Sequence, residues 1–263
     1  LGIAHAVSLC REFAGSEPFV VYLGDNVLHR GITRFVSDFA ASGAAASVVL
    51  KEVDDPSAFG VARMDGERMT AVVEKPSVPP SHLAVTGVYA FTPAVFTVIA
   101  GQTASARGEL EIADSINGLI AAGHRVDATI TSDDWIDTGK MDDILAANRI
   151  VLAGLVGGAG PGTLAARGID PRARLQDCQV IGPCVIGPGA VLRKCIIGPH
   201  VAIGADCRLE DVTIANAIVM ERAHLANCPG IADSMIGRDA VVCGVPAGSR
   251  LTLGDHSRIE GLA

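Results

Sequence analysis

The stretch VIGPCVIGPGAVLRKCIIGPHVAIG, residues 180–204, decides the fold of the C-terminal part of this chain. It repeats the triplet Ile-Gly-Pro, which starts at Ile181, Ile186 and Ile197. A helix would not keep a Gly-Pro pair inside each period, because proline removes a backbone donor and clashes with the preceding turn. Six-residue repeats are instead typical of a parallel β-helix, in which each repeat forms one short strand and a turn.

Aliphatic residues continue this period beyond the quoted stretch. These anchors are five or six residues apart and comprise Ile181, Ile186, Leu192, Ile197, Ile203, Leu209, Ile214 and Val219. We expect each anchor to point inward and to stack on its equivalent in the next coil. An aromatic content of only 4% suits a narrow interior. The spacing predicts an irregular hexapeptide-repeat parallel β-helix over 167–246, with a tail at 247–263. A general glycine-rich β domain is the alternative, and the recurring triplet favours the β-helix.

Residues 1–152 have a different pattern, in which helical and strand signals alternate. The apolar run Phe19–Leu23 is bounded by Gly-Asp-Asn and predicts a buried strand. The segment 61–73 has two apolar runs on either side of Asp-Gly and predicts a hairpin. The last helical pattern covers Met141–Leu152. This alternation predicts an α/β domain with a largely parallel sheet, whose ligands gather at the carboxyl ends of strands. A glycine-rich linker should follow at 153–166.

The composition argues against several classes of protein. The chain has 263 residues and a formal net charge of −8, whereas a nucleic-acid binder would carry a basic surface. Its longest uncharged run, Ile150–Ala166, contains five glycines and one proline. This run is too short and too interrupted for a membrane span of about 20 apolar residues. Seven cysteines without any Cys-x-x-Cys pair fit neither a disulfide framework nor a zinc site. We expect a cytoplasmic protein with buried thiols.

Seven short motifs occur in a fixed order along the chain. They begin at Leu1 (LGIAHA), Val21 (VYLGDN), Phe59 (FGVA), Glu74 (EKP), Val85 (VTGVY), Arg107 (RGELEI) and Trp135 (WIDTG). In order and spacing they resemble the motifs of the sugar-phosphate nucleotidyltransferases, and among these the glucose-1-phosphate thymidylyltransferases. The hexapeptide repeats and the closing LGDHS at Leu253 resemble the long form of these enzymes. The resemblance implies an α/β, Rossmann-like nucleotidyltransferase domain, N-terminally incomplete here, followed by a left-handed parallel β-helix.

The family transfers a nucleotidyl group from dTTP to glucose 1-phosphate and releases pyrophosphate. Because two polyanions meet in this reaction, the site needs a divalent cation and cationic side chains. Asp25 follows the strand Phe19–Leu23, and Asp137 follows a strand that should end near Ile130. Two carboxylates at neighbouring strand ends can share one Mg²⁺, and the resemblance implies that Asp25 and Asp137 are catalytic metal ligands. Taken alone, Gly-Asp-Asn and Asp-Thr-Gly would more often form turns or caps.

The resemblance also implies which residues bind the substrates. Glu74 would hydrogen-bond sugar hydroxyls, and Lys75 would meet the sugar phosphate as a binding and catalytic residue. The following proline stops a helix and keeps both side chains at a strand end. The other predicted substrate-binding residues are Gly2 near the base, Gly60 beside the hexose, Val85, Thr86, and Arg107 on the phosphate side. The alternatives are a solvated ion pair, turn glycines and a solvent-facing arginine.

One departure from the family concerns its opening segment. Family members begin with a Gly-rich turn that wraps the triphosphate, and this chain shows no such turn, so we expect a fragment that is inactive alone. The nucleotide could also be UTP or GTP, and the sugar could be mannose. The β-helix could be an acetyltransferase, or a purely structural element that joins subunits. We expect dTTP and glucose 1-phosphate as partners and a homo-oligomer, without nucleic-acid or membrane partners.

Overall fold

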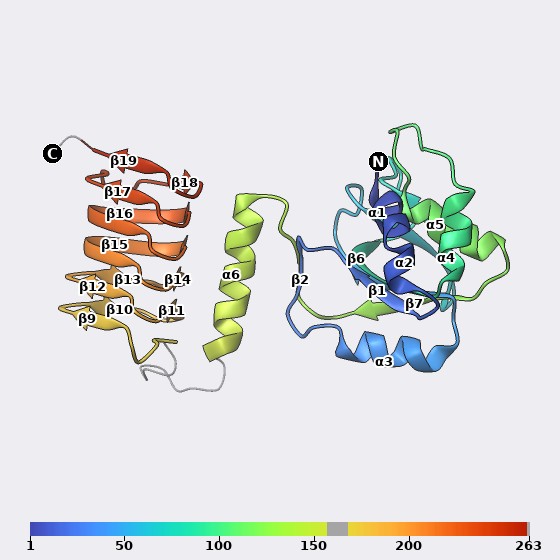
Figure 1. Cartoon of the computed structure of the whole chain (residues 1–263), viewed down its shortest axis with the longest axis horizontal. Coiled ribbons are helices and arrows are strands. Elements are labelled where there is room, and N and C mark those ends of the chain that lie inside the picture. Colours follow the sequence, from blue (N-terminus) through green and yellow to red (C-terminus); the bar gives the residue numbers. More distant parts are fainter. Residues whose placement is uncertain (157–167, 262–263) are drawn as a thin grey trace. The chain divides into compact units, whose positions relative to one another are not determined.

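The computed structural model describes residues 1–156 and 168–261. They form two compact units, Leu1–Asp137 and Thr138–Ala263 (Figure 1). The first unit contains helices and a mixed sheet, and the second contains one helix and stacked short strands. In the part of the chain that the structure describes, no helix has the length and hydropathy needed to cross a membrane.

Helices and strands alternate along unit 1, as the sequence predicts. Its helices are α1 (Ile3–Leu9), α2 (Arg11–Ala14), α3 (Thr33–Ser42), α4 (Ala94–Ala100) and α5 (Ile112–Ala121). Its strands are β1 (Phe19–Tyr22), β2 (Asn26–Leu28), β3 (Ala46–Glu52), β4 (Gly60–Asp65), β5 (Arg68–Glu74), β6 (Leu83–Phe91), β7 (Val126–Thr131) and β8 (Trp135–Asp137).

The central sheet of unit 1 has the strand order β5-β4-β6-β3-β7, and β1 also pairs with β6. Strand β6 runs antiparallel to β1, β3 and β4, and of the pairings described in this sheet only β3 with β7 is parallel. The prediction of a largely parallel sheet is therefore wrong. A parallel neighbour needs a crossover of a dozen or more residues. Helices α4 and α5 lie between β6 and β7 in the chain and let β7 pair in parallel with β3, whereas β6 follows the β4–β5 hairpin without a helix.

Apolar side chains cover both faces of this sheet. On one face, Leu50 of β3 and Phe91 of β6 belong to a core shared with α1, α4 and α5. On the other face, Val49 and Val88 pack with Phe39 of α3. Neighbouring residues of one strand thus point to opposite faces, as the period of two requires. The predicted α/β class is confirmed.

Two strand pairs position the candidate site. Strands β4 and β5 form the predicted hairpin, in which Gly60 pairs with Glu74. Strands β2 and β8 form a separate two-stranded ribbon, in which Asn26 pairs with Asp137. The ribbon was not predicted, because strands of three residues are too short to show an alternating pattern.

Unit 2 is a parallel β-solenoid with one helix, α6 (Met141–Val156). Its strands are β9 (Arg174–Gln176), β10 (Gln179–Val180), β11 (Cys184–Ile186), β12 (Val191–Arg193), β13 (Ile196–Ile197), β14 (Val201–Ile203), β15 (Arg208–Val219), β16 (His224–Ile236), β17 (Val241–Cys243), β18 (Thr252–Leu253) and β19 (Arg258–Glu260).

The solenoid coils have nearly equal lengths and show one irregularity, a register shift between Val212 and Ile214. Along one face, β9, β12, β15, β16, β17 and β19 pair in parallel, and register partners are 16 or 17 residues apart. Each coil therefore holds three of the short repeats, and the β-helix prediction is confirmed. Seven of the eight predicted anchors are at most 2% exposed. The exception is Ile181, which is 41% exposed because its neighbour Val180 points inward and pairs with Ile197.

The solenoid core also contains buried thiols. Cys184, Cys195, Cys207 and Cys228 are buried, and each belongs to the core cluster of the solenoid. Burial raises the pKa of both Cys195 and Cys207 to about 11. These thiols therefore act as small apolar core residues at neutral pH.

Helix α6 packs on the solenoid strands β15 and β16. The Asn148 side-chain amide donates to the carbonyl of His200 at 3.2 Å, and Arg149 donates to the Asn216 side chain at 3.1 Å. The helix that was predicted to end the α/β domain at residue 152 thus belongs to unit 2. It includes residues 153–156 of the predicted linker, and 157–166 lie outside the described residues. Within the predicted tail at 247–263, β18 pairs in parallel with β16, and β19 pairs in parallel with β17.

Candidate active site

A cavity of about 250 Å³ in unit 1 brings most of the predicted site residues together. Six of them line it: Asp25, Gly60, Glu74, Lys75, Val85 and Asp137. They come from the turn after β1, the β4–β5 hairpin, strand β6 and the end of β8. A few polar groups that converge on one concave space are the usual form of a small-molecule site.

The β2–β8 ribbon brings Asp25 and Asp137 to neighbouring strands. Asp25 directly precedes Asn26, whose register partner is Asp137. The Asn26 side-chain amide donates to Asp25 Oδ1 at 2.8 Å, and its oxygen accepts from the Trp135 indole at 2.7 Å. Asn26 is only 9% exposed, so this network holds the Asp25 carboxylate in one orientation. Asp137 is the last residue of β8 and follows β7, which ends at Thr131, next to the predicted end near Ile130.

The two carboxylates suit a hard divalent cation. Asp25 and Asp137 line the same cavity, and Mg²⁺ prefers oxygen ligands. Among the described residues, no group of three or more His, Cys, Asp or Glu side chains is placed to hold a metal ion. Two carboxylates are nevertheless enough from the protein, because Mg²⁺ usually keeps waters and takes further ligands from substrate phosphates. The donor set therefore fits such an ion.

Glu74 and Lys75 are fixed at the end of the hairpin. Glu74 is the last residue of β5, and the Lys75 backbone N–H donates to the carbonyl of Phe59 at 2.9 Å. Lys75 has a φ of 41°, in the left-handed region that costs a non-glycine residue about 1–3 kcal/mol. Strain of this kind persists only where the surrounding structure imposes it. The backbone around Lys75 is therefore held in place beside the cavity.

Gly60 keeps the space in front of Glu74 open. A Cβ at Gly60 would lie 3.2 Å from Glu74 Oε2 and 3.3 Å from Val72 Cγ1. Contacts this short would require both neighbours to move. Glycine therefore leaves space beside the carboxylate, and the position of Gly60 next to a hexose stays a prediction.

Arg107 balances the carboxylates around Glu74. Its guanidinium lies 3.4 Å from Glu74, 3.4 Å from Glu109 and 3.6 Å from Glu111. Burial first, and then the charge of Glu111, raise the pKa of Glu74, while Lys75 and Arg107 oppose this rise. Glu74 and Glu111 line the cavity and Arg107 does not. The guanidinium thus stabilises the carboxylates of the cavity wall.

Two predicted substrate-binding residues lie next to the cavity wall and not in it. Thr86 is fully buried, and its hydroxyl donates to the carbonyl of Val49 at 3.0 Å. Gly2 has a φ of 80°, and a Cβ there would clash with the backbone of Leu110. Their chain neighbours Val85 and Ile3 line the cavity. Thr86 and Gly2 therefore occupy packing positions that support the wall.

The structure adds thirteen lining residues that were not predicted, and nine of them lie inside the seven motifs, among them Asn26, Phe59, Gly87, Tyr89, Glu111 and Trp135. For these nine the signal was membership of a motif and not the residue type. The rings of Phe59 and Trp135 meet edge to face with centroids 5.0 Å apart. They provide the aromatic part of the wall.

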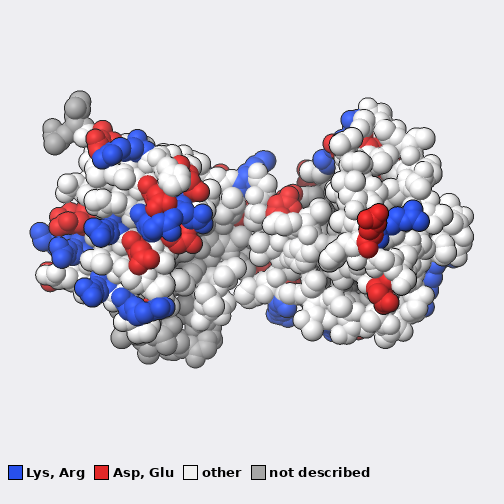
Figure 2. All heavy atoms as spheres, in the orientation of Figure 1, with Lys and Arg blue, Asp and Glu red and all other residues white. Residues whose placement is uncertain are grey.

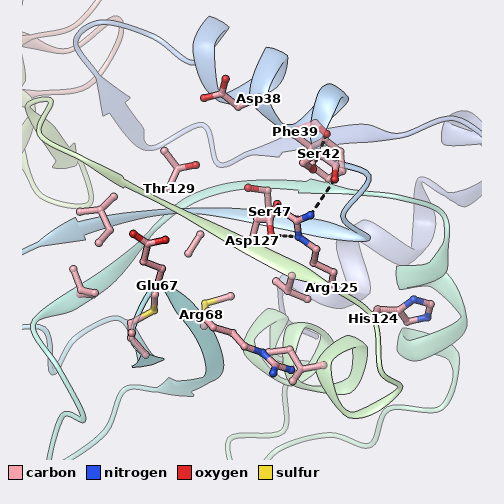
Figure 3. A pocket seen from close by; sticks show the side chains of 18 of the residues that line it. Asp38, Phe39, Ser42, Ser47, Glu67, Arg68, His124, Arg125, Asp127 and Thr129 are labelled. Atoms are coloured by element: carbon pink, nitrogen blue, oxygen red, sulfur yellow. Dashed lines mark hydrogen bonds and ion pairs between the residues drawn. The ribbon is translucent and has the colours of Figure 1, made fainter.

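A larger cavity of about 980 Å³ lies elsewhere in unit 1 (Figure 3). It is bounded by β7, the β4–β5 turn and the end of α3, and it shares no lining residue with the smaller cavity. Within it, Arg125 pairs with Asp127 at 2.7 Å and donates to the Ser42 carbonyl at 3.3 Å. None of the predicted site residues lines it, so the smaller cavity is the candidate active site.

Known proteins share both the sequence and the fold of this chain. A family model described as nucleotidyl transferase matches residues 1–154. A glucose-1-phosphate thymidylyltransferase from Streptomyces griseus is 38% identical over 271 residues, which cover 99% of this chain and 76% of that protein. A low-salt glycan biosynthesis nucleotidyltransferase from Haloferax volcanii is 36% identical over 280 residues, with the same two coverages of 99% and 76%. A Bacillus anthracis crystal structure assigned as a glucose-1-phosphate thymidylyltransferase, in complex with sucrose, matches with a TM-score of 0.53 at 39% identity. That match covers 57% of this chain and 61% of that one.

Proposed function

Because this chain belongs to the nucleotidyl transferase family, we propose that it makes dTDP-glucose from dTTP and glucose 1-phosphate and releases pyrophosphate. At a coarser level it is a sugar-1-phosphate nucleotidyltransferase. The observation that carries the proposal is one cavity lined by two carboxylates, Asp25 and Asp137, and by the Glu74–Lys75 pair. The thymidylyltransferase from Streptomyces griseus, which matches 99% of the chain, supports the choice of thymidine and glucose.

The reaction joins a phosphate oxygen of glucose 1-phosphate to the α-phosphorus of dTTP. As that bond forms, the bond from the α-phosphorus to the bridging oxygen breaks, and pyrophosphate leaves with the electron pair. Asp25 and Asp137 would hold the divalent ion that enzymes of this family generally use, which when bound neutralises phosphate charge. Asn26 holds Asp25 in place beforehand, so little reorganisation is needed during the reaction.

Glu74 and Lys75 would bind the sugar phosphate. The Glu74 carboxylate is largely removed from water, which raises its pKa, and hexose hydroxyls can replace the lost water as hydrogen-bond donors. Lys75, which also lines the cavity, would contact the phosphate of glucose 1-phosphate. Gly60 has no side chain in front of Glu74 and would leave room in the cavity for the sugar ring. The cavity is therefore suited to bind a phosphorylated hexose.

Calorimetric titration of glucose 1-phosphate into the full chain tests the sugar side without relying on turnover. Lys75→Ala should weaken binding about tenfold or more, because a hydrogen bond to a charged group contributes about 1.5–3 kcal/mol. Lys194→Ala is the matched control, since Lys194 is an exposed solenoid lysine. Equal affinities of the wild type and Lys75→Ala would contradict the position given to the sugar phosphate.

Two further measurements test the metal and the nucleotide. Asp25→Asn and Asp137→Asn should each weaken Mn²⁺ binding, followed by electron paramagnetic resonance, and unchanged binding would refute the metal site. Product formation with dTTP, UTP and GTP, measured on this chain preceded by the Gly-rich opening segment of the family, should show the highest kcat/KM for dTTP. A preference for UTP or GTP would refute the proposed nucleotide, while the family assignment would stand.

A further inference from the structure

A third pocket lies on the outer surface of the solenoid and shares no lining residue with the two cavities of unit 1. Its volume is about 420 Å³, and it is lined by Arg174, Val191, Arg193, Arg208, Leu209, Glu210 and His224. All of these residues belong to strands β9, β12, β15 and β16 of one solenoid face. The pocket is therefore built by a single unit of the chain.

The register of the coils brings its basic side chains together. Arg174, Val191, Arg208 and His224 are successive partners in one column across this face. Strands in a sheet are about 4.8 Å apart, so the Arg174 and Arg208 backbones are about 10 Å apart with Val191 between them. Arg193 lies two residues beyond Val191 on the same outward side. Three guanidinium groups thus surround a short, half-buried valine, which leaves a hollow between them.

The arginines of this pocket differ from other arginines of unit 2. Five of the others are paired with carboxylates: Arg172 with Asp170, Arg222 with Asp239, Arg238 with Glu221, Arg250 with Asp142, and Arg258 with Glu260. Among the described residues, no carboxylate lies within ion-pair distance of Arg174, Arg193 or Arg208. Three guanidinium groups therefore share a pocket that contains one carboxylate, that of Glu210.

This concentration of positive charge is unexpected in a chain with a net charge of −8. Figure 2 shows charged side chains gathered on the solenoid face turned to the viewer, whereas the visible face of unit 1 is mostly uncharged. Glu210 is the register partner of Arg193, whereas Arg174 and Arg208 pair with Val191 and His224 and have no carboxylate directly opposite them. An anion bound between the arginines would balance this remaining positive charge.

We propose that this pocket binds a small molecule with two or more phosphate groups. The planar guanidinium matches phosphate oxygens with two parallel hydrogen bonds, and three such groups around one hollow can contact more than one phosphate. The His224 ring adds a further donor at the edge of the column. Inorganic pyrophosphate, nucleoside triphosphates and nucleotide sugars all share this chemistry, and competition among them separates these sources.

The test is calorimetric titration of inorganic pyrophosphate into the full chain in EDTA, where a metal-dependent active site does not contribute. The wild type should bind, and Arg193→Gln and Arg208→Gln should each weaken binding about tenfold or more. Arg258→Gln is the matched control, since Arg258 lies in the same column but is paired with Glu260 at 2.8 Å. Lys75→Ala should also bind normally, which separates this site from the proposed sugar-phosphate site.

Competition then identifies the natural source. We would compare the concentrations at which dTTP, dTDP-glucose and glucose 1-phosphate displace pyrophosphate. The compound that does so at the lowest concentration has the phosphate arrangement that fits the pocket. Glucose 1-phosphate has only one phosphate and should compete least. The proposal is overturned if both arginine variants bind pyrophosphate as the wild type does. It is also overturned if Arg193→Gln and Arg208→Gln leave the affinity for pyrophosphate unchanged but dissociate an oligomer in sedimentation. This solenoid face would then bind another protein chain.

Discussion

Replacing Gly87 with alanine should disturb the candidate site through Asn26. Gly87 has a φ of 72°, and a Cβ there would lie 2.9 Å from Asn26 Nδ2 and 3.0 Å from Leu23 Cδ1. Alanine in the left-handed region costs about 1–2 kcal/mol, and overpacking costs about 1–3 kcal/mol. The less flexible unfolded chain offsets about 0.4–1 kcal/mol of this. Gly87→Ala should therefore lower the free energy of unfolding by about 1–4 kcal/mol.

Gly66→Ala is the matched control for this substitution. Gly66 has a φ of 60° in the β4–β5 turn, and an added Cβ would meet nothing within 4 Å. The control therefore has the backbone cost without the contact cost. The two variants should differ by about 1–3 kcal/mol, which isolates the contacts with Asn26 and Leu23.

Guanidinium unfolding followed by tryptophan fluorescence measures both effects. Trp135 is the only tryptophan, and its indole donates to Asn26 at 2.7 Å. Moving Asn26 should therefore shift the native emission of Gly87→Ala, whereas Gly66→Ala should keep the wild-type spectrum. If the two variants lose the same stability and have the same spectrum, Gly87 does not constrain Asn26 and the reasoning is refuted.

Three further predictions concern the solenoid core and the cavity wall. Ile214→Ala should lower the free energy of unfolding by about 2–5 kcal/mol because Ile214 is fully buried. Ile181 is 41% exposed, so Ile181→Ala should lower it by less than about 1 kcal/mol. Equal losses in thermal unfolding would contradict the orientations of the two side chains. Because burial raises the pKa of Glu74 above its usual 4.5, ionisation destabilises the wild type as pH rises through the raised value. The stability of Glu74→Gln relative to the wild type should therefore increase from about pH 4 to about pH 7 in urea unfolding, and a constant difference would show that Glu74 is not desolvated. Thr86→Val should lose about 0.5–1.5 kcal/mol of stability because it removes the hydrogen bond to the Val49 carbonyl. The affinity for glucose 1-phosphate should not change. A large loss of affinity would place Thr86 in contact with the sugar.

The solenoid was the most predictable part of the fold. The same kind of inward-pointing residue recurs in every coil. A wrong prediction at one position is therefore corrected by the pattern of the following coils. The phase at the first coils was not predictable, because Val180 and Ile181 are aliphatic neighbours and the period does not say which one points inward. The structure selects Val180, which pairs with Ile197.

The placement of α6 could not be predicted from its own sequence. Its residues show that a helix forms, but not which body it packs against. That choice depends on contacts such as Asn148 with the carbonyl of His200, between residues far apart in the chain. The direction of β6 was missed for a related reason, because alternating signals predict element types and leave strand direction to the lengths of the connections.

Sequence motifs predicted several of the residues that line the candidate site. They did not predict the contacts between distant side chains. Asp25, Glu74, Lys75 and Asp137 lie in motifs and line one cavity. The bond from Trp135 to Asn26 joins residues 109 positions apart, and no local pattern reports such a contact. Thr86 shows the opposite error, since a motif residue can serve packing while its neighbour Val85 faces the cavity.

The nearly constant coil length of the solenoid also limits how this protein can change its length during evolution. Each coil of 16 or 17 residues pairs only with the coil before it and the coil after it. Duplication or loss of one whole coil therefore leaves every face aligned and changes the length by about 4.8 Å. An insertion of one or three residues within a strand would instead turn the following residues of that strand to the opposite side, so that their anchor would face water. Natural length variation in this region should accordingly occur in whole coils or in loops that leave the stack.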